Sequence, residues 1–194
     1  ALMQQQGFES IIHVYGRDRN QMALQGDLLG AFVLGIRNLI VVRGEEISHC
    51  DHRKARTVDD LDEIAILEMI RGLQQGLDLA GFELKGAPTF TTGCTLPACA
   101  DETAFDAALE QARQKVAAGA EYVVTAPVFD LDHGVSCVNR AKGLGVPVIP
   151  TVLLLKSVGM ARYISVNEPG AKMSEALIAR IRKAHDREEE CLRI

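Results

Sequence analysis

Five short runs of aliphatic and β-branched residues recur along the chain, and each is followed by a segment with helical character. The runs are 10–15, 38–42, 88–92, 121–125 and 146–153. Several are continuous stretches of Val, Ile and Leu, which is typical of strands buried on both faces of a parallel sheet. The run 88–92 carries the weakest β signal. The pattern predicts a parallel sheet.

Apolar residues at three- and four-residue spacings predict helices between and after these runs. The predicted helices are 20–34, 59–73, 103–118, 157–166 and 174 to about 190. The first is followed by Gly35, a typical C-terminal cap. The second begins with acidic residues, which favour a helix N-terminus. Strands that alternate with helices predict an α/β fold.

Such units build either an open doubly wound sheet or a (β/α)8 barrel. No Gly-rich phosphate fingerprint follows a predicted strand, which weakens the dinucleotide-binding form of the open sheet. A barrel takes about 250 residues, or roughly 30 per unit, and five units in 194 residues come close to this rate. We therefore expect an incomplete (β/α)8 TIM barrel forming a single partial domain over 1–194. Because the sequence begins Ala1-Leu2-Met3 and reaches a strand almost at once, we expect it to be the interior of a longer protein.

The composition excludes several classes of protein. The 21 basic and 26 acidic residues give a net charge of −5, and a nucleic-acid binder is expected to carry a basic patch instead. No apolar run reaches the roughly 18 residues of a membrane span, and no signal peptide is recognisable. The five cysteines are odd in number and irregularly spaced, which favours a reduced, cytoplasmic protein.

Polar residues follow the predicted strands, where a barrel places its chemistry. They lie in the segments 13–20, 43–46, 93–97, 125–130 and 154–157. Taken alone, Arg17 to Asn20 is equally typical of a solvated helix start, and Arg43 to Glu45 of a plain loop. Together they favour a site, because they fall at the same end of consecutive strands.

The cysteines and histidines give no strong metal or redox signal. The segment His49-Cys50-Asp51-His52 contains metal-compatible ligands, but no second pair lies at a zinc-ligand spacing, so a solvated loop and no metal are expected. Cys94 and Cys99 are interpreted as ordinary reduced cysteines.

Several ungapped segments, in order along the whole chain, resemble the methylenetetrahydrofolate reductase family. They are 13–20, 25–31, 34–38, 43–45, 58–62, 115–120, 125–130, 152–157 and 167–170. The resemblance implies a (β/α)8 barrel that holds FAD or FMN at the C-terminal ends of its strands. The implied reaction is the reduction of 5,10-methylenetetrahydrofolate to 5-methyltetrahydrofolate with NADH or NADPH, in one-carbon metabolism and methionine biosynthesis. A homo-oligomer or a subunit of a larger complex is expected.

The resemblance also implies roles for particular residues. The expected flavin-binding residues are His13, Tyr15, Val42, Arg43, Gly44, Leu96 and Lys115. The expected folate-binding residues are Thr125, Ala126, Phe129 and Met160. Glu45 stands where the family has a catalytic aspartate, whose charge favours the iminium form of the folate.

This sequence departs from the family at two further substrate positions. Ala126 and Met160 stand where family members carry Gln. The family's general acid, a Glu on the first strand, is expected upstream, and the eighth strand downstream, so the chain corresponds to units three to seven of eight. Two alternatives stay open: a relative without turnover that serves as a flavin- or pterin-binding or electron-transfer subunit, and a pterin-binding barrel of the methyltransferase type.

Overall fold

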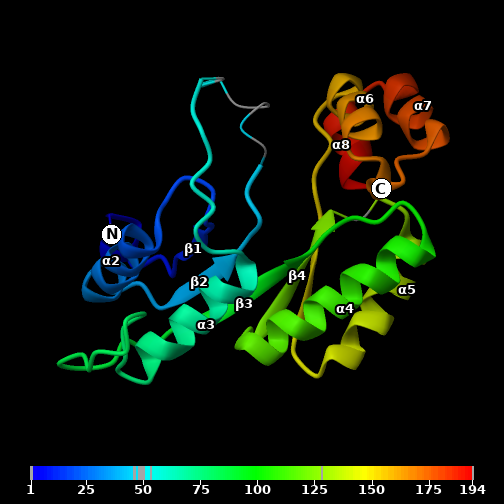
Figure 1. Cartoon of the computed structure of the whole chain (residues 1–194). Coiled ribbons are helices and arrows are strands. Elements are labelled where there is room, and N and C mark those ends of the chain that lie inside the picture. The colour runs from blue at the N-terminus through cyan, green and yellow to red at the C-terminus, as the bar shows by residue number, and fades with distance from the viewer. Residues whose placement is uncertain (1, 46, 48–50, 53, 128, 194) are drawn as a thin grey trace. The chain divides into compact units, whose positions relative to one another are not determined.

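The computed structural model describes residues 2–45, 47, 51–52, 54–127 and 129–193. Its five strands form a parallel sheet in the order β1-β2-β3-β4-β5, and helices alternate with the strands (Figure 1). Among the described strands, β1 and β5 each have one neighbour, so the sheet does not close. This confirms the predicted α/β fold, and the open sheet is consistent with part of a TIM barrel.

The chain divides into two compact units. Unit 1 comprises Ala1–Thr95 and Arg113–Tyr122, and unit 2 comprises Leu96–Ala112 and Val123–Ile194. The elements that begin in unit 1 are α1 (Leu2–Gln5), β1 (Ile11–Val14), α2 (Gln21–Val33), β2 (Asn38–Val41), α3 (Glu63–Gln74) and β3 (Thr91–Leu96). Helix α4 (Glu102–Ala118) starts in unit 2 and ends in unit 1.

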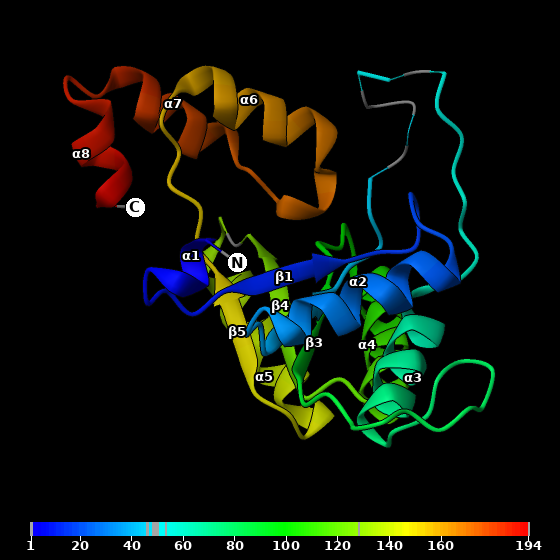
Figure 2. The same cartoon turned by 90° about the vertical axis from the view of Figure 1, so that its left-hand side faces the viewer.

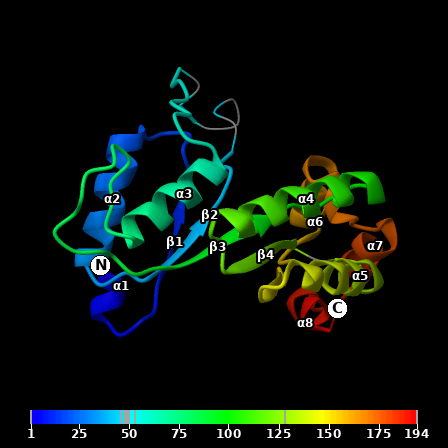
Figure 3. The same cartoon turned by 60° about the horizontal axis from the view of Figure 1, so that its bottom comes forward.

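The remaining elements belong almost wholly to unit 2. They are β4 (Tyr122–Pro127), α5 (Leu131–Ala141), η2 (Lys142–Leu144), β5 (Val148–Thr151), α6 (Val158–Asn167), η3 (Pro169–Ala171), α7 (Glu175–Lys183) and α8 (Arg187–Leu192). Figure 3 shows α4 and α5 side by side, and Arg140 of α5 forms ion pairs with Glu102 and Asp106 of α4.

Side-chain caps explain where the helices start. Asn20, Asp62, Asp130, Ser157 and Ser174 each accept a hydrogen bond from the backbone N–H three residues further on. Such a bond satisfies an N–H group that the helix itself leaves unpaired. The predicted helix starts near 20, 157 and 174 agree with these caps.

Three predicted elements differ from the structure. The third strand is Thr91–Leu96 rather than 88–92, because buried Gly93 and Cys94 carry little β signal. The second helix begins at Glu63 rather than Asp59, whose φ of 48° is not helical. The last predicted helix is two helices, since Ala184 is extended and Asp186 caps a new start. No range was predicted for α5, although Leu131, Val135 and Val138 follow a helical spacing.

Each unit has its own apolar core. In unit 1, α2 and α3 lie along one face of β1 and β2 (Figures 2 and 3) and bury the side chains of Leu28, Leu39, Ile66, Ile70 and Leu73. In unit 2, helices α6, α7 and α8 group around a cluster formed by Leu155, Ala161, Met173, Ile178 and Ile181 (Figure 1). Burial of apolar surface is the main force that stabilises both cores.

Gly93 lies against the ring of Tyr122 in unit 1. A Cβ atom at position 93 would overlap three atoms of this ring. The Tyr122 hydroxyl donates a hydrogen bond to the backbone oxygen of Leu39 at 2.8 Å, so the ring cannot move aside without losing that bond. Glycine is therefore required in the middle of β3 because the Tyr122 ring approaches the backbone closely, and not because the backbone adopts an unusual conformation.

We expect Gly93→Ala to lower the free energy of unfolding by roughly 2 kcal/mol, since overpacking a core costs about 1–3 kcal/mol. Urea unfolding followed by circular dichroism measures this. Gly26→Ala in α2 is the matched control, because nothing lies within 4 Å of its added Cβ. The control should gain roughly 0.5–1 kcal/mol from helix propensity. Equal stability of the two variants would contradict the predicted overlap.

Candidate functional site

The carboxyl ends of β1 and β2 are held together in unit 1 beyond the strands themselves. The N–H of Val42 donates to the backbone oxygen of Val14 at 3.0 Å, which extends the parallel ladder by one residue. The Arg17 guanidinium then donates to the backbone oxygen of Glu45 at 2.6 Å. These bonds bring the two predicted site segments, 13–20 and 43–45, to one edge of unit 1.

Tyr15 and Gly44 meet at this edge. The Arg17 guanidinium lies 5.3 Å from the centre of the Tyr15 ring, within the range of a cation–π contact. Gly44 has a φ of 78°, and a Cβ atom there would come within 3.4 Å of the ring. The loop after β2 can therefore turn tightly beside Tyr15 only with glycine.

Arg17 was part of the predicted motif but not a predicted site residue, and it organises this edge. It forms a two-bond ion pair with Asp18, with both nitrogen–oxygen distances at 2.7 Å. The hydrogen bonds from Arg17 hold the pKa of the Asp18 carboxyl below its ordinary value. Val42 is half-buried here, whereas the side chains of His13, Arg43 and Glu45 are exposed.

Lys115 is buried, as a cofactor-binding cation in a helix would require, and it has a partner within the chain. Its ammonium lies 2.5 Å from Oε1 of Glu63, in the first turn of α3, and the two side chains are 8% and 19% exposed. Glu63 was not predicted as a site residue. The pair lies 52 positions apart in the sequence, so no local pattern could have revealed it.

The thiol of Cys94 lies close enough to this ion pair to interact with both of its charges. Burial raises its pKa to about 11, while the charge of Lys115 opposes the shift and that of Glu63 adds to it. Cys94 is fully buried in β3 and therefore carries a neutral thiol at ordinary pH. This agrees with its interpretation as an ordinary reduced cysteine.

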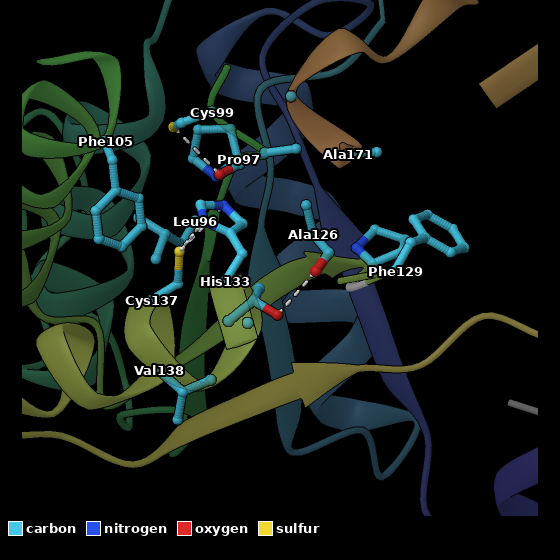
Figure 4. A pocket seen from close by; sticks show the side chains of 15 residues that line it. Leu96, Pro97, Cys99, Phe105, Ala126, Phe129, His133, Cys137, Val138 and Ala171 are labelled. Carbon is cyan, nitrogen blue, oxygen red and sulfur yellow. Dashed lines mark hydrogen bonds between the residues drawn. The ribbon is translucent and has the colours of Figure 1, made fainter. Parts of the chain in front are cut away.

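Unit 2 contains a pocket at the ends of β3 and β4, which Figure 4 shows from close by. Four predicted site residues line it: Leu96, Thr125, Ala126 and Phe129. The other lining residues are Pro97, Ala98, Cys99, Phe105, Pro127, His133, Gly134, Cys137, Val138, Gly170 and Ala171. The predicted residue Met160 is not among them, because it packs on α6 against the apolar cluster of unit 2.

Most polar side chains of the pocket are already satisfied within the chain. The Thr125 hydroxyl donates to the backbone oxygen of Ala126 at 2.9 Å and accepts from the N–H of Thr151 at 3.2 Å. The Cys99 thiol donates to the backbone oxygen of Pro97 at 3.5 Å. These side chains shape the wall of the pocket rather than offering groups to a ligand.

His133 and Cys137 are two lining residues that sequence reasoning missed, and their side chains contact each other. They lie four residues apart on α5, and the sulfur is 3.4 Å from Nε2 of the imidazole. The i,i+4 spacing was the available signal, but no helix had been predicted there. Burial raises the pKa of the Cys137 thiol, and Glu102 adds to the effect, so this sulfur is also a neutral thiol.

No group of three or more potential ligands that could hold a metal occurs among the described residues. Of the segment His49-Cys50-Asp51-His52, Asp51 and His52 are described and exposed, whereas His49 and Cys50 lie outside the described residues, as do Glu46 and Val128 of the predicted motifs. Within the described part of the chain, no helix is long and apolar enough to cross a membrane.

Removing one partner of the buried Lys115–Glu63 ion pair should lower the free energy of unfolding far more than removing both. We expect Lys115→Met alone to lower the free energy of unfolding by about 3–5 kcal/mol, because the Glu63 carboxylate stays buried without its cation. The double variant Lys115→Met, Glu63→Leu should recover most of this loss in urea unfolding. Arg19→Met breaks an exposed pair, 56% accessible on both sides, and should cost under about 1 kcal/mol. Additive losses at positions 63 and 115 would contradict the pairing.

The raised pKa of Cys94 predicts a loss of stability in alkali. The thiol ionises near 9.0 in the unfolded chain and near 11 in the folded chain, so its contribution is complete below pH 9 and is lost as the pH rises towards 11. Between about pH 8 and 10.5, the protein should lose about 2 kcal/mol more than Cys94→Ala does. Urea unfolding in reducing buffer tests this, and Tyr122, whose pKa is also raised by burial, titrates in both proteins. If the stability of the protein and of Cys94→Ala changed with pH in parallel, the prediction would be refuted.

Comparison with models of known protein families gives a match that covers the whole chain. The family model described as "Methylenetetrahydrofolate reductase" matches residues 1–194. No curated protein sequence matches the chain. The resemblance that the sequence segments carry is therefore confirmed at the level of the family, and the protein belongs to the methylenetetrahydrofolate reductase family.

Proposed function

We propose that this protein is a flavin-dependent reductase that converts 5,10-methylenetetrahydrofolate to 5-methyltetrahydrofolate with NADH or NADPH. Family membership over the whole chain is the observation that carries the proposal. The geometry of each unit supports it, because both gather predicted site residues at the carboxyl ends of parallel strands, the end at which barrels place their chemistry.

The residues of unit 1 fit an anionic cofactor such as FAD or FMN. Arg43 offers an exposed guanidinium after β2, and Gly44 lets the backbone pass close to any ligand at this edge. Val42, Tyr15 and His13 stand at the same edge as expected contacts. When bound, the flavin supplies the hydride chemistry, and the protein supplies orientation and charge.

Lys115 fits such a cofactor under one condition. Its ammonium has three hydrogens, and Glu63 accepts from one of them in the structure. A flavin phosphate would therefore share the ammonium with Glu63 rather than find it unpaired. We propose that Glu63 sets the position of Lys115 for this contact.

The apolar walls of the pocket in unit 2 suit contact with the face of a flat ring, such as that of a pterin or a flavin. Leu96, Phe105 and Phe129 supply apolar walls, and Ala126 contributes no polar side chain. Thr125 is engaged with the backbone. Sites for small ligands commonly combine such walls with a few polar groups that fix the orientation.

Glu45 is the proposed catalytic residue. Its backbone oxygen is tied to Arg17, which fixes the loop, while its side chain is exposed. A carboxylate near the folate stabilises the positive charge that develops in the iminium form. Glu carries this charge one methylene further from the backbone than the Asp of the family does.

A second candidate function is a binding or electron-transfer subunit without turnover. The half-buried methyl group of Ala126 in the pocket favours this second function. Family members carry Gln at this position, and without its amide the polar edge of a pterin loses a hydrogen-bond partner. In either case we propose a cytoplasmic protein that works as a homo-oligomer or in a larger complex, in line with its irregularly spaced cysteines.

The first test is spectroscopic. The purified protein should bind FMN or FAD, its visible absorbance should bleach with NADH or NADPH under argon, and 5,10-methylenetetrahydrofolate should restore it. Glu45→Gln should keep the flavin and slow the reoxidation by folate about 10²-fold, the cost of losing one electrostatic stabiliser. Glu45→Asp should retain the rate, and Glu83→Gln, at an exposed loop position, is the matched control. Failure to take up either flavin would refute the proposal.

The same assay separates the second candidate. Flavin that is bound and reduced but never reoxidised by folate, with turnover appearing in Ala126→Gln, would establish the binding subunit instead. Ala117→Gln on the exposed face of α4 controls for the added amide.

A further inference from the structure

His133 lies between two other side chains of unit 2, inside the pocket. Its Nδ1 is 3.3 Å from the ammonium of Lys172, and its Nε2 is 3.4 Å from the sulfur of Cys137 (Figure 4 shows the contact with Cys137). The backbone N–H of His133 donates to the Asp130 carboxylate at 2.8 Å, which fixes the start of α5 and so the base of the imidazole. The ring therefore has a side chain on either hand, and its backbone is fixed by the helix cap.

The backbone that carries Lys172 is strained. Lys172 has a φ of 50°, a left-handed conformation that costs roughly 1 kcal/mol in residues other than Gly, Asn and Asp. The segment just before it is fixed by close packing, since a Cβ atom on Gly170 would lie 2.5 Å from the carbonyl carbon of Ala98. The packing of this segment therefore sets the backbone at Lys172 and the direction in which its side chain starts.

The contact with Lys172 decides which nitrogen of His133 carries the proton. An ammonium group can only donate hydrogen bonds. Nδ1 must therefore accept from Lys172, which leaves the proton of the neutral ring on Nε2. The sulfur of Cys137 lies 3.4 Å from Nε2 and 3.9 Å from Nδ1, beside the ring rather than along the Nε2–H bond, so it does not accept from this N–H.

This arrangement gives the pocket a donor that a ligand can take over. The hydroxyl of Thr125 and the thiol of Cys99 are bonded to backbone groups. The Nε2–H of His133 has the sulfur of Cys137 beside it, off the direction of the bond, and no oxygen or nitrogen acceptor among the described residues. An oxygen or nitrogen atom of a ligand would give this N–H the acceptor that it lacks within the chain, which makes the bond favourable.

We propose that His133 is the hydrogen-bond donor of this pocket, that it offers Nε2–H to a carbonyl oxygen or ring nitrogen of a pterin, and that Lys172 is the positioning residue that fixes its tautomer. The choice of a pterin rests on the proposed function. The donor stands on α5, in the pocket where Ala126 supplies no polar group of its own.

The tautomer is tested directly by nitrogen-15 NMR of the histidine-labelled protein. The chain has five histidines, and His133→Gln identifies the signal that belongs to His133. We expect the Nε2–H form in the protein and a mixture of the two neutral forms in Lys172→Met. Lys142→Met, which removes an exposed lysine just after α5, should leave the signal unchanged. An Nδ1–H form in the unmodified protein would overturn the proposal.

Ligand binding is tested with folic acid as the probe, by titration of the full chain. His133→Leu should weaken binding about five- to tenfold, the effect of one hydrogen bond. His133→Gln, whose amide nitrogen reaches the place of Nε2, should restore most of the affinity, and Lys172→Met should fall between the two. Equal affinities of the protein, His133→Leu and His133→Gln would overturn the proposal.

The two proposals fail in different ways. If flavin binds and is turned over while His133→Leu leaves the affinity for folic acid unchanged, the role of His133 is refuted and the proposed function stands. If no flavin is taken up, the proposed function is refuted, whereas the tautomer experiment still decides whether Lys172 orients His133.

Discussion

The buried ion pair of Lys115 and Glu63 is the constraint on which unit 1 depends. It joins the last turns of α4 to the first turn of α3, directly beside the buried thiol of Cys94. Neither charge can be left alone in such surroundings, because burying an unpaired ion costs several kcal/mol. The two helices are thereby tied together, and any anion that uses Lys115 has to share it with a carboxylate of the same chain.

The two units meet the requirements of a ligand site in different ways. In unit 1, polar and charged groups of the strand ends are exposed or bonded to backbone, as Arg43 and Arg17 illustrate. In unit 2, the pocket has apolar walls, and its hydroxyl and thiol groups are turned onto backbone oxygens. Unit 1 therefore presents charge at its strand ends, whereas unit 2 presents an apolar surface.

Much of the fold and part of the site could be predicted from the sequence. Continuous aliphatic runs and N-capping residues are local signals, and they located four strands and the helix starts at Asn20, Ser157 and Ser174. The third strand was misplaced because Gly93 is there to admit the Tyr122 ring, a contact between residues distant in sequence. Glu63, the partner of Lys115, and Lys172, the partner of His133, were missed for the same reason. Ion pairs and histidine tautomers depend on residues that are distant in the sequence, and the spacing of apolar residues carries no information about them.

The strained backbone of Lys172 shows how unit 2 balances stability against chemistry. Glycine at this position would relieve the left-handed conformation, yet it would leave Nδ1 of His133 without its donor. The proton of the imidazole could then occupy either nitrogen, and the rings protonated on Nδ1 would turn an acceptor rather than a donor to the ligand. A cost of roughly 1 kcal/mol in the backbone thus secures a single hydrogen-bonding state of the ring. The close packing of Gly170 on Ala98 makes that cost tolerable, because it holds the segment in place whichever residue follows.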